Sequence, residues 1–129
     1  FADSSENHFR FVSSLESYVA KVEVQYLQQV ILNLLSNADK FTKQGTITLE
    51  VSVNESFIEF AVSDTGCGIP QEKQQVVFER FIKLNDFAQG TGLGLSICKL
   101  IIQKWGGEIW VDPAYSKGAR LVFTHPIVK

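Results

Sequence analysis

Hydrophobic residues between positions 24 and 41 recur at steps of three and four, which is the period of an α-helix. The repeating positions are Val24, Leu27, Val30, Ile31, Leu34, Leu35, Ala38 and Phe41. A second stretch with a helical pattern covers residues 95–105 and ends at Gly106-Gly107, a common stop signal for helices. The chain is therefore predicted to contain two amphipathic helices, each with one face in a core.

Alternation of apolar and polar residues predicts the strands. Residues 46–53 place every second side chain on one side, the pattern of a half-buried strand. Residues 54–56 form a polar turn into a second strand over residues 57–63, so these two strands are predicted to form an antiparallel hairpin. Further short strands are predicted around residues 9–11, 17–22, 108–111 and 120–124.

The order of these elements defines the fold class. Pro70 suits the first turn of a short helix predicted over residues 71–81, and the aperiodic residues 82–92 favour a mobile loop. Helices interleaved with hairpin-connected strands favour an α+β fold, a two-layer α/β sandwich with helices on one face of a mainly antiparallel mixed sheet. We expect residues 1–7 to be a linker or disordered edge and residues 8–129 to form one domain.

Composition narrows the functional class. The 129 residues carry 12 Lys and Arg against 14 Asp and Glu, a balance that disfavours binding to nucleic acid or to an anionic membrane. No apolar run approaches the ~20 residues that span a bilayer, and Cys67 and Cys98 lack the spacing of metal ligands. We therefore expect a cytoplasmic domain without direct membrane contact. Because the chain starts at Phe1 without an initiator methionine, we also expect it to be part of a longer protein.

Three polar residues interrupt the first predicted helix. Asn33, Asn37 and Lys40 share a stripe beside the apolar face, although asparagine is a mediocre helix former. One interpretation is a solvated flank of the helix. The other is a wall for metal and phosphate, because amide oxygens are hard ligands that suit Mg²⁺ and lysine supplies a positive charge for phosphate.

Two glycine-rich segments are further candidates. Residues 64–69 read Asp-Thr-Gly-Cys-Gly-Ile directly after a predicted strand, where glycines admit a ligand close to the backbone and Asp64 can accept a hydrogen bond from an amino group. An ordinary strand-to-helix turn explains the same residues. Residues 90–95 read Gly-Thr-Gly-Leu-Gly-Leu and lead into the second helix, whose free N–H groups and positive dipole end favour phosphate binding.

The order of four motifs is more specific than any one of them. Residues 33–42 (Asn-x-x-x-Asn-Ala-x-Lys-Phe-Thr), residues 64–69, residues 78–81 (Phe-Glu-Arg-Phe) and residues 90–95 resemble the N, G1, F and G2 boxes of sensor histidine kinases. From about Phe9 to the C-terminus, the chain is similar to the catalytic and ATP-binding domain of that family. The resemblance implies the Bergerat-type fold of the superfamily shared with gyrase, the heat-shock chaperone and mismatch-repair ATPases.

The resemblance also implies roles for individual residues. Three of them would be catalytic: Asn33, the polar residue one turn before the metal ligand, and the phosphate contacts Lys40 and Lys83. Asn37 matches the magnesium ligand, Phe41 an aromatic residue beside adenine, and Asp64 the carboxylate that accepts from the adenine amino group. The remaining cofactor-binding positions, which shape the adenine pocket and the phosphate loop with its lid hinge, are Gly66, Gly68, Ile69, Gly90, Thr91, Gly92, Leu93, Gly94 and Leu95.

By this resemblance, the domain binds Mg-ATP and transfers the γ-phosphoryl group to a histidine on a separate dimerisation domain, upstream of a response regulator. The parent chain of such a domain can be anchored in the inner membrane. Neither His8 nor His125 lies in the family's phosphoacceptor signature, and Leu121 replaces an aromatic residue of the last family motif. Related hydrolytic ATPases have a water-activating glutamate at the position of Asn33, which cannot take a proton.

Two other functions remain open from the sequence. One is an ATP-binding regulatory or interaction module that transfers no phosphate. The other is a serine kinase of the anti-sigma type, which shares the ATP pocket, although the Phe-Glu-Arg-Phe motif at residues 78–81 favours the histidine kinase.

Overall fold

A computed structural model describes residues 7–13, 24–79 and 94–127, and a five-stranded sheet forms the centre of this part of the chain. The strands are β1 (His8–Ser13), β2 (Thr46–Val53), β3 (Phe57–Asp64), β4 (Ile109–Val111) and β5 (Arg120–Pro126), in the spatial order β1-β2-β3-β5-β4. β1 is parallel to β2, and the other three pairings are antiparallel. The predicted mixed, mainly antiparallel sheet is confirmed.

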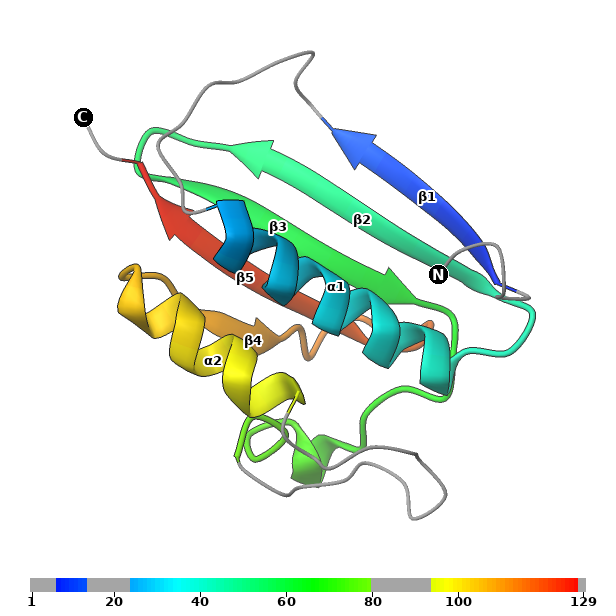
Figure 1. Cartoon of the computed structure of the whole chain (residues 1–129). Coiled ribbons are helices and arrows are strands. Elements are labelled where there is room, and N and C mark those ends of the chain that lie inside the picture. Colours follow the sequence, from blue (N-terminus) through cyan, green and yellow to red (C-terminus); the bar gives the residue numbers. More distant parts are fainter. Residues whose placement is uncertain (1–6, 14–23, 80–93, 128–129) are drawn as a thin grey trace.

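The helices α1 (Val24–Phe41) and α2 (Gly94–Lys104) both cover one face of the sheet (Figure 1). Val30, Leu34 and Ala38 of α1 are buried, and their spacing of four residues places them on one side of the helix. They share a hydrophobic core with Phe60 of β3 and Phe123 of β5, whose rings stack with centroids 4.7 Å apart. The predicted two-layer sandwich is therefore confirmed.

Local turn chemistry explains where several elements end. Asn54 Oδ1 accepts hydrogen bonds from the backbone N–H groups of Ser56 at 2.7 Å and Phe57 at 2.8 Å, which closes the β2–β3 hairpin. Gly106 has a φ of 86°, and the N–H of the next residue, Gly107, bonds the Ile102 carbonyl at 2.9 Å. Both the hairpin turn and the glycine stop after α2 are confirmed.

The helix predicted over residues 71–81 is too long. Within the described part of this segment, residues 71–79, only Gln71–Lys73 form a 3-10 helix, and the N–H groups at 73, 74, 76 and 79 each bond the carbonyl three residues earlier. The reason is that the apolar residues of this segment are consecutive. Val77 and Phe78 are buried side by side, which successive tight turns allow without a helical period.

Other predictions concern residues near the ends of the described ranges. The strand expected around residues 9–11 is present as β1, whereas the strand at 17–22 and the loop at 82–92 lie outside the described residues. Asn7 makes three hydrogen bonds to the region where α1 ends: Nδ2 donates to Asp39 Oδ1 and to the Thr42 carbonyl, and Oδ1 accepts from the Gly45 N–H. These contacts join the start of β1 to the end of α1.

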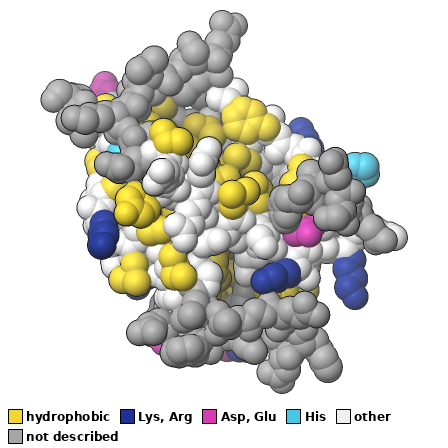
Figure 2. Space-filling view, viewed as in Figure 1, with side chains coloured by type: hydrophobic (Ala, Val, Ile, Leu, Met, Phe, Trp, Pro, Cys, Tyr) yellow, Lys and Arg dark blue, Asp and Glu magenta, His cyan; other side chains and the backbone are white. Residues whose placement is uncertain are grey.

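Hydrophobic side chains also reach the surface on the face that carries the helices (Figure 2). The exposed large hydrophobic residues of α1 and α2 are Val24, Tyr26, Leu32 and Leu100. Despite this apolar surface, neither helix in the described residues is both long and apolar enough to cross a membrane.

Candidate functional site

Asp64 is the last residue of the central strand β3, and it is buried with 4% of its surface exposed. Its Oδ1 atom accepts hydrogen bonds from the backbone N–H groups of Gly66 at 2.9 Å and Ala119 at 3.1 Å. Among the described residues, both bonds to this carboxylate end on Oδ1. The second oxygen is therefore the one suited to accept a hydrogen bond from a ligand.

The environment of Asp64 acts on its pKa in two opposite directions. Burial raises the pKa of the carboxyl group above its ordinary value of 3.8, and the N–H groups of Gly66 and Ala119 act to lower the pKa. Burial has the larger effect. A carboxylate that loses hydration on folding and keeps an oxygen for further bonding is typical of a recognition site.

The loop after Asp64 lies against the end of α1. The Cys67 N–H donates to the carbonyl of Phe41 at 3.2 Å, and a Cβ atom on Gly66 would overlap that same carbonyl. Gly68 has a φ of 76°, a backbone conformation that favours glycine. The two predicted motifs, the asparagine-containing helix end and the glycine loop, are therefore in direct contact.

A buried hydroxyl group also lies at this junction. Thr42 is 3% exposed, and its Oγ1 atom has no hydrogen-bond partner among the described residues. A Cβ atom on Gly66 would lie 2.7 Å from this oxygen, so the hydroxyl occupies the space beside the loop. Close packing by itself explains why this position is glycine.

The polar stripe of α1 is only partly exposed to solvent. Asn33 and Asn37 are half-buried and Lys40 is exposed. Burial raises the pKa of the Cys98 thiol on α2 to about 11, and the nearby Asn33 side chain acts in the opposite direction. The Cys98 thiol donates to the backbone carbonyl of Val30 on α1 at 3.8 Å, and this contact joins the two helices. Phe41 is half-buried at the end of the helix.

The described residues cover only one end of the second glycine-rich motif. Leu95 is buried at the start of α2, whereas Gly94 is exposed, and a Cβ atom there would meet none of the described residues within 4 Å. Lys83 and the other residues of the motif, Gly90, Thr91, Gly92 and Leu93, lie outside the described residues. Ile69, from the first motif, is buried in the core.

The sequence-based site omitted the turn between β4 and β5. The Ala119 N–H binds Asp64 Oδ1, and a Cβ atom on Gly118 would lie 2.6 Å from the same oxygen. The hydroxyl of Tyr115 donates to the Asp64 backbone carbonyl at 3.0 Å. The glycine before the last strand was a sequence signal for this turn, but its contact with Asp64 depends on the pairing of β3 with β5.

The donor set indicates how a metal ion could be held. The described residues contain no group of three or more His, Cys, Asp or Glu side chains that could bind one. A cation that keeps several waters and takes oxygen ligands from phosphate needs only one or two protein ligands, and Mg²⁺ behaves in this way. The amide oxygen of Asn37 fits that requirement.

A helix-covered sheet with a buried carboxylate at the end of its central strand places the chain in the two-layer α+β class. Residues 23–129 match the family model for histidine kinase-, DNA gyrase B-, and HSP90-like ATPases, and the chain belongs to this family. The sensor histidine kinase WalK of Bacillus subtilis is 35% identical over 135 residues, which cover 98% of this chain and 22% of WalK. The chain thus spans about a quarter of this relative's length.

Solved structures agree with this assignment. The catalytic domain of the histidine kinase ThkA superposes with a TM-score of 0.84 at 29% identity, covering 96% of this chain and 82% of that domain. Full-length ShkA in complex with AMPPNP superposes with a TM-score of 0.85 at 28% identity, covering 95% of this chain and 26% of ShkA. ThkA is also known in complex with the response regulator TrrA, with a TM-score of 0.80 at 27% identity, covering 95% of this chain and 34% of that chain. The chain is thus a sensor histidine kinase catalytic domain with the Bergerat fold.

Proposed function

We propose that this domain binds Mg-ATP and transfers the γ-phosphoryl group to a histidine on a separate phosphoacceptor domain of its parent chain or of a dimer partner. The observation that carries the proposal is the buried Asp64 carboxylate, held through Oδ1 by two backbone N–H groups. This arrangement suits recognition of an amino group on a flat base, because the remaining oxygen accepts from it. The complex of ShkA with AMPPNP supports a nucleotide as the ligand.

The phosphate end of the nucleotide would lie along the polar stripe of α1. In this proposal Asn37 contributes an amide oxygen to Mg²⁺, and the exposed Lys40 contacts phosphate oxygens. Lys83 and the N–H groups of residues 90–94 are proposed as further phosphate contacts. The metal ion, when bound, supplies positive charge that neutralises the phosphate oxygens.

Catalysis by this domain would consist of positioning and charge stabilisation. The acceptor imidazole is nucleophilic when neutral, so it forms a bond to the γ-phosphorus while the bond to the ADP oxygen breaks. No strong base is needed in the domain, which agrees with Asn33 in a place where a carboxylate would activate water. The half-buried Asn33 lies near Cys98 of α2 and is proposed to hold this part of the wall.

The acceptor histidine is expected to come from outside this domain. His125 is 5% exposed in β5, where its Nδ1 lies 2.8 Å from the Pro126 carbonyl and its ring lies against Trp105. His8 is on the edge strand β1, without the acidic neighbour of a phosphoacceptor signature. We propose that the phosphate then passes to a response regulator, a partner class supported by the complex of ThkA with TrrA, and that the domain works in the cytoplasm.

Phosphotransfer distinguishes a kinase from a regulatory ATP-binding module. The chain is incubated with γ-labelled ATP and a separately produced histidine-bearing dimerisation domain of its parent. Acid-labile label on that domain is the expected result. Tight ATP binding without transfer would favour the regulatory module, and an acid-stable phosphoprotein would favour a serine kinase.

Substitution of Asn37 tests the site itself. Asn37→Ala is expected to lower Mg²⁺-dependent ATP affinity about tenfold or more, because an oxygen ligand of the metal is lost. Gln29→Ala removes an exposed amide from the same helix and is the matched control. Circular dichroism checks that both variants stay folded, and titration calorimetry measures their ATP affinity. Equal affinity in the two variants would contradict the assignment of Asn37.

A further inference from the structure

The turn between β4 and β5 is fixed by Asp112. The backbone N–H of Asp112 bonds the Arg120 carbonyl at 2.8 Å, and its Oδ1 accepts from the Ala114 N–H at 3.0 Å. Its Oδ2 accepts from Arg120 Nη1, also at 3.0 Å. The Asp112 side chain therefore caps the turn at Ala114 and connects the turn to β5. Because Tyr115 directly follows Ala114, these contacts limit where Tyr115 can lie.

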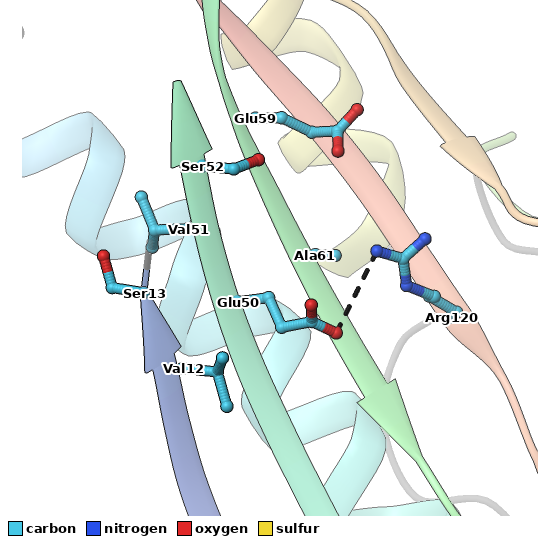
Figure 3. A pocket seen from close by; sticks show the side chains of 8 residues that line it. All are labelled: Val12, Ser13, Glu50, Val51, Ser52, Glu59, Ala61 and Arg120. Carbon is cyan, nitrogen blue, oxygen red and sulfur yellow. Dashed lines mark ion pairs between the residues drawn. The ribbon is translucent and has the colours of Figure 1, made fainter. Parts of the chain in front are cut away.

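Arg120 belongs to the face of the sheet opposite the helices. A shallow hollow there is lined by Arg120, Glu50 and Glu59 among others (Figure 3). Arg120 Nη2 lies 4.0 Å from Glu50 Oε1, so the guanidinium group is held between β2 and the turn. Its side chain is 23% exposed, which makes this pairing less screened than one on the open surface.

Tyr115 reaches from this turn to the carboxylate strand end. Its hydroxyl group donates to the backbone carbonyl of Asp64 at 3.0 Å, and the side chain is half-buried. The same turn supplies the Ala119 N–H to Asp64 Oδ1 and the Ala119 carbonyl to the Asp64 N–H. Asp64 is thus held by the turn at its N–H, its carbonyl and its side chain.

Contact with a backbone carbonyl influences the carboxylate through the geometry of the residue. When the N–H and carbonyl of Asp64 are both held, its backbone dihedrals are restricted and the carboxylate keeps one orientation. A Cβ atom on Gly118 would overlap the Asp64 carbonyl, so the turn lies as close to this residue as backbone allows. Tolerances below about 1 Å matter for recognition by hydrogen bonds.

We propose that Tyr115 is a positioning residue that sets discrimination for adenine by orienting the Asp64 carboxylate. The proposal rests on the proposed function, in which Asp64 accepts from the adenine amino group. Tyr115 does not touch the base in this view. It makes the carboxylate more selective by reducing the orientations from which Oδ2 accepts a hydrogen bond.

The test compares two nucleotides on the whole chain. Dissociation constants are measured for ATP and for purine riboside triphosphate, which is ATP without the 6-amino group. Tyr115→Phe keeps the ring and removes the hydroxyl, and Tyr26→Phe on the exposed first turn of α1 is the matched control. In Tyr115→Phe we expect ATP to bind about 3- to 10-fold more weakly, the value of one hydrogen bond, with analogue binding unchanged.

The ratio of the two constants separates positioning from a merely structural role. The discrimination ratio is the dissociation constant of the analogue divided by that of ATP, and it should fall in Tyr115→Phe. A merely structural role would weaken the binding of both nucleotides equally and leave the ratio unchanged, and an unchanged ratio would overturn the proposal. Asp112→Ala removes the cap of the turn, and it is expected to lower the discrimination ratio as Tyr115→Phe does. An unchanged ratio in Asp112→Ala would overturn the part assigned to the turn.

The chain without substitutions distinguishes failure of this inference from failure of the proposed function. If the unsubstituted chain binds ATP and the analogue equally, the adenine role of Asp64 is overturned, and the role of Tyr115 with it. If the unsubstituted chain prefers ATP and the Tyr115→Phe variant keeps the same preference, only the role of Tyr115 is overturned.

Discussion

Two glycines of the candidate site, Gly66 and Gly94, differ in how tightly the described residues enclose them. At Gly66, a Cβ atom would overlap the Phe41 carbonyl and approach the Thr42 hydroxyl, whereas at Gly94 it would meet no part of the described ranges within 4 Å. Gly66 is required by close packing, whereas close packing against the described residues does not require Gly94 at the start of α2. The same residue type therefore allows a close backbone approach at Gly66, whereas at Gly94 it begins a helix whose first N–H groups are proposed as phosphate contacts.

The largest effect is expected at the tight end. Gly66→Ala should lower the free energy of unfolding by about 2–3 kcal/mol, because the new methyl group displaces the end of α1 from the loop. Urea unfolding measures this change. A loss below about 0.5 kcal/mol, the usual range of surface substitutions, would mean that the loop yields easily and would remove the contrast with Gly94.

The carboxylate in the tight wall should show a conflict between stability and binding. Asp64→Asn keeps an oxygen for the N–H groups of Gly66 and Ala119 but removes the charge. We expect ATP affinity to fall about 10- to 100-fold, the value of a charge-assisted hydrogen bond, together with weaker discrimination between adenine and guanine nucleotides. Titration with ATP and GTP measures both effects.

The same substitution gives a pH-dependent test of stability. Because burial raises the pKa of Asp64 above 3.8, the folded state binds this proton more tightly than the unfolded state. The unsubstituted chain should therefore lose stability relative to Asp64→Asn as the pH rises from 3.8 through the raised pKa. Urea unfolding from about pH 4 to pH 7 follows this difference, with Glu55→Gln in the exposed β2–β3 turn as the control. If the unsubstituted chain instead gains stability relative to Asp64→Asn as the pH rises, the effect of burial is contradicted.

The smallest effect on stability is expected at the open end. Gly94→Ala should leave the free energy of unfolding unchanged or raise it by up to about 1 kcal/mol, because alanine is the better helix former and its Cβ atom would contact none of the residues that the structure describes. If the N–H groups at this helix start contact phosphate, ATP affinity should nevertheless decrease. Thermal unfolding and ATP titration on the same sample separate the two quantities. A clear loss of stability would show that Gly94 is as closely packed as Gly66 and would contradict this prediction.

Local patterns predicted most of the elements and part of the site. The apolar spacing of α1, the alternation in β2 and the glycine stop after α2 follow from the periods of single elements, and each is confirmed. The helix over residues 71–81 was predicted too long, since Pro70 marks a start and nothing in the segment enforces a helical period. The assignments of Asn37, Lys40 and the phosphate loop to ligand contacts stay predictions.

The sequence by itself determined that this chain is a helix-and-hairpin domain with four ordered motifs, and those motifs were enough to indicate its family. Tertiary structure decided what surrounds Asp64. Tyr115, Gly118 and Ala119 lie more than 50 positions away in the chain, and only the antiparallel pairing of β3 with β5 brings them to the carboxylate. The physical reason is that periodicity reports the face on which a residue lies within its own element, whereas strand order decides which residues from other elements meet it.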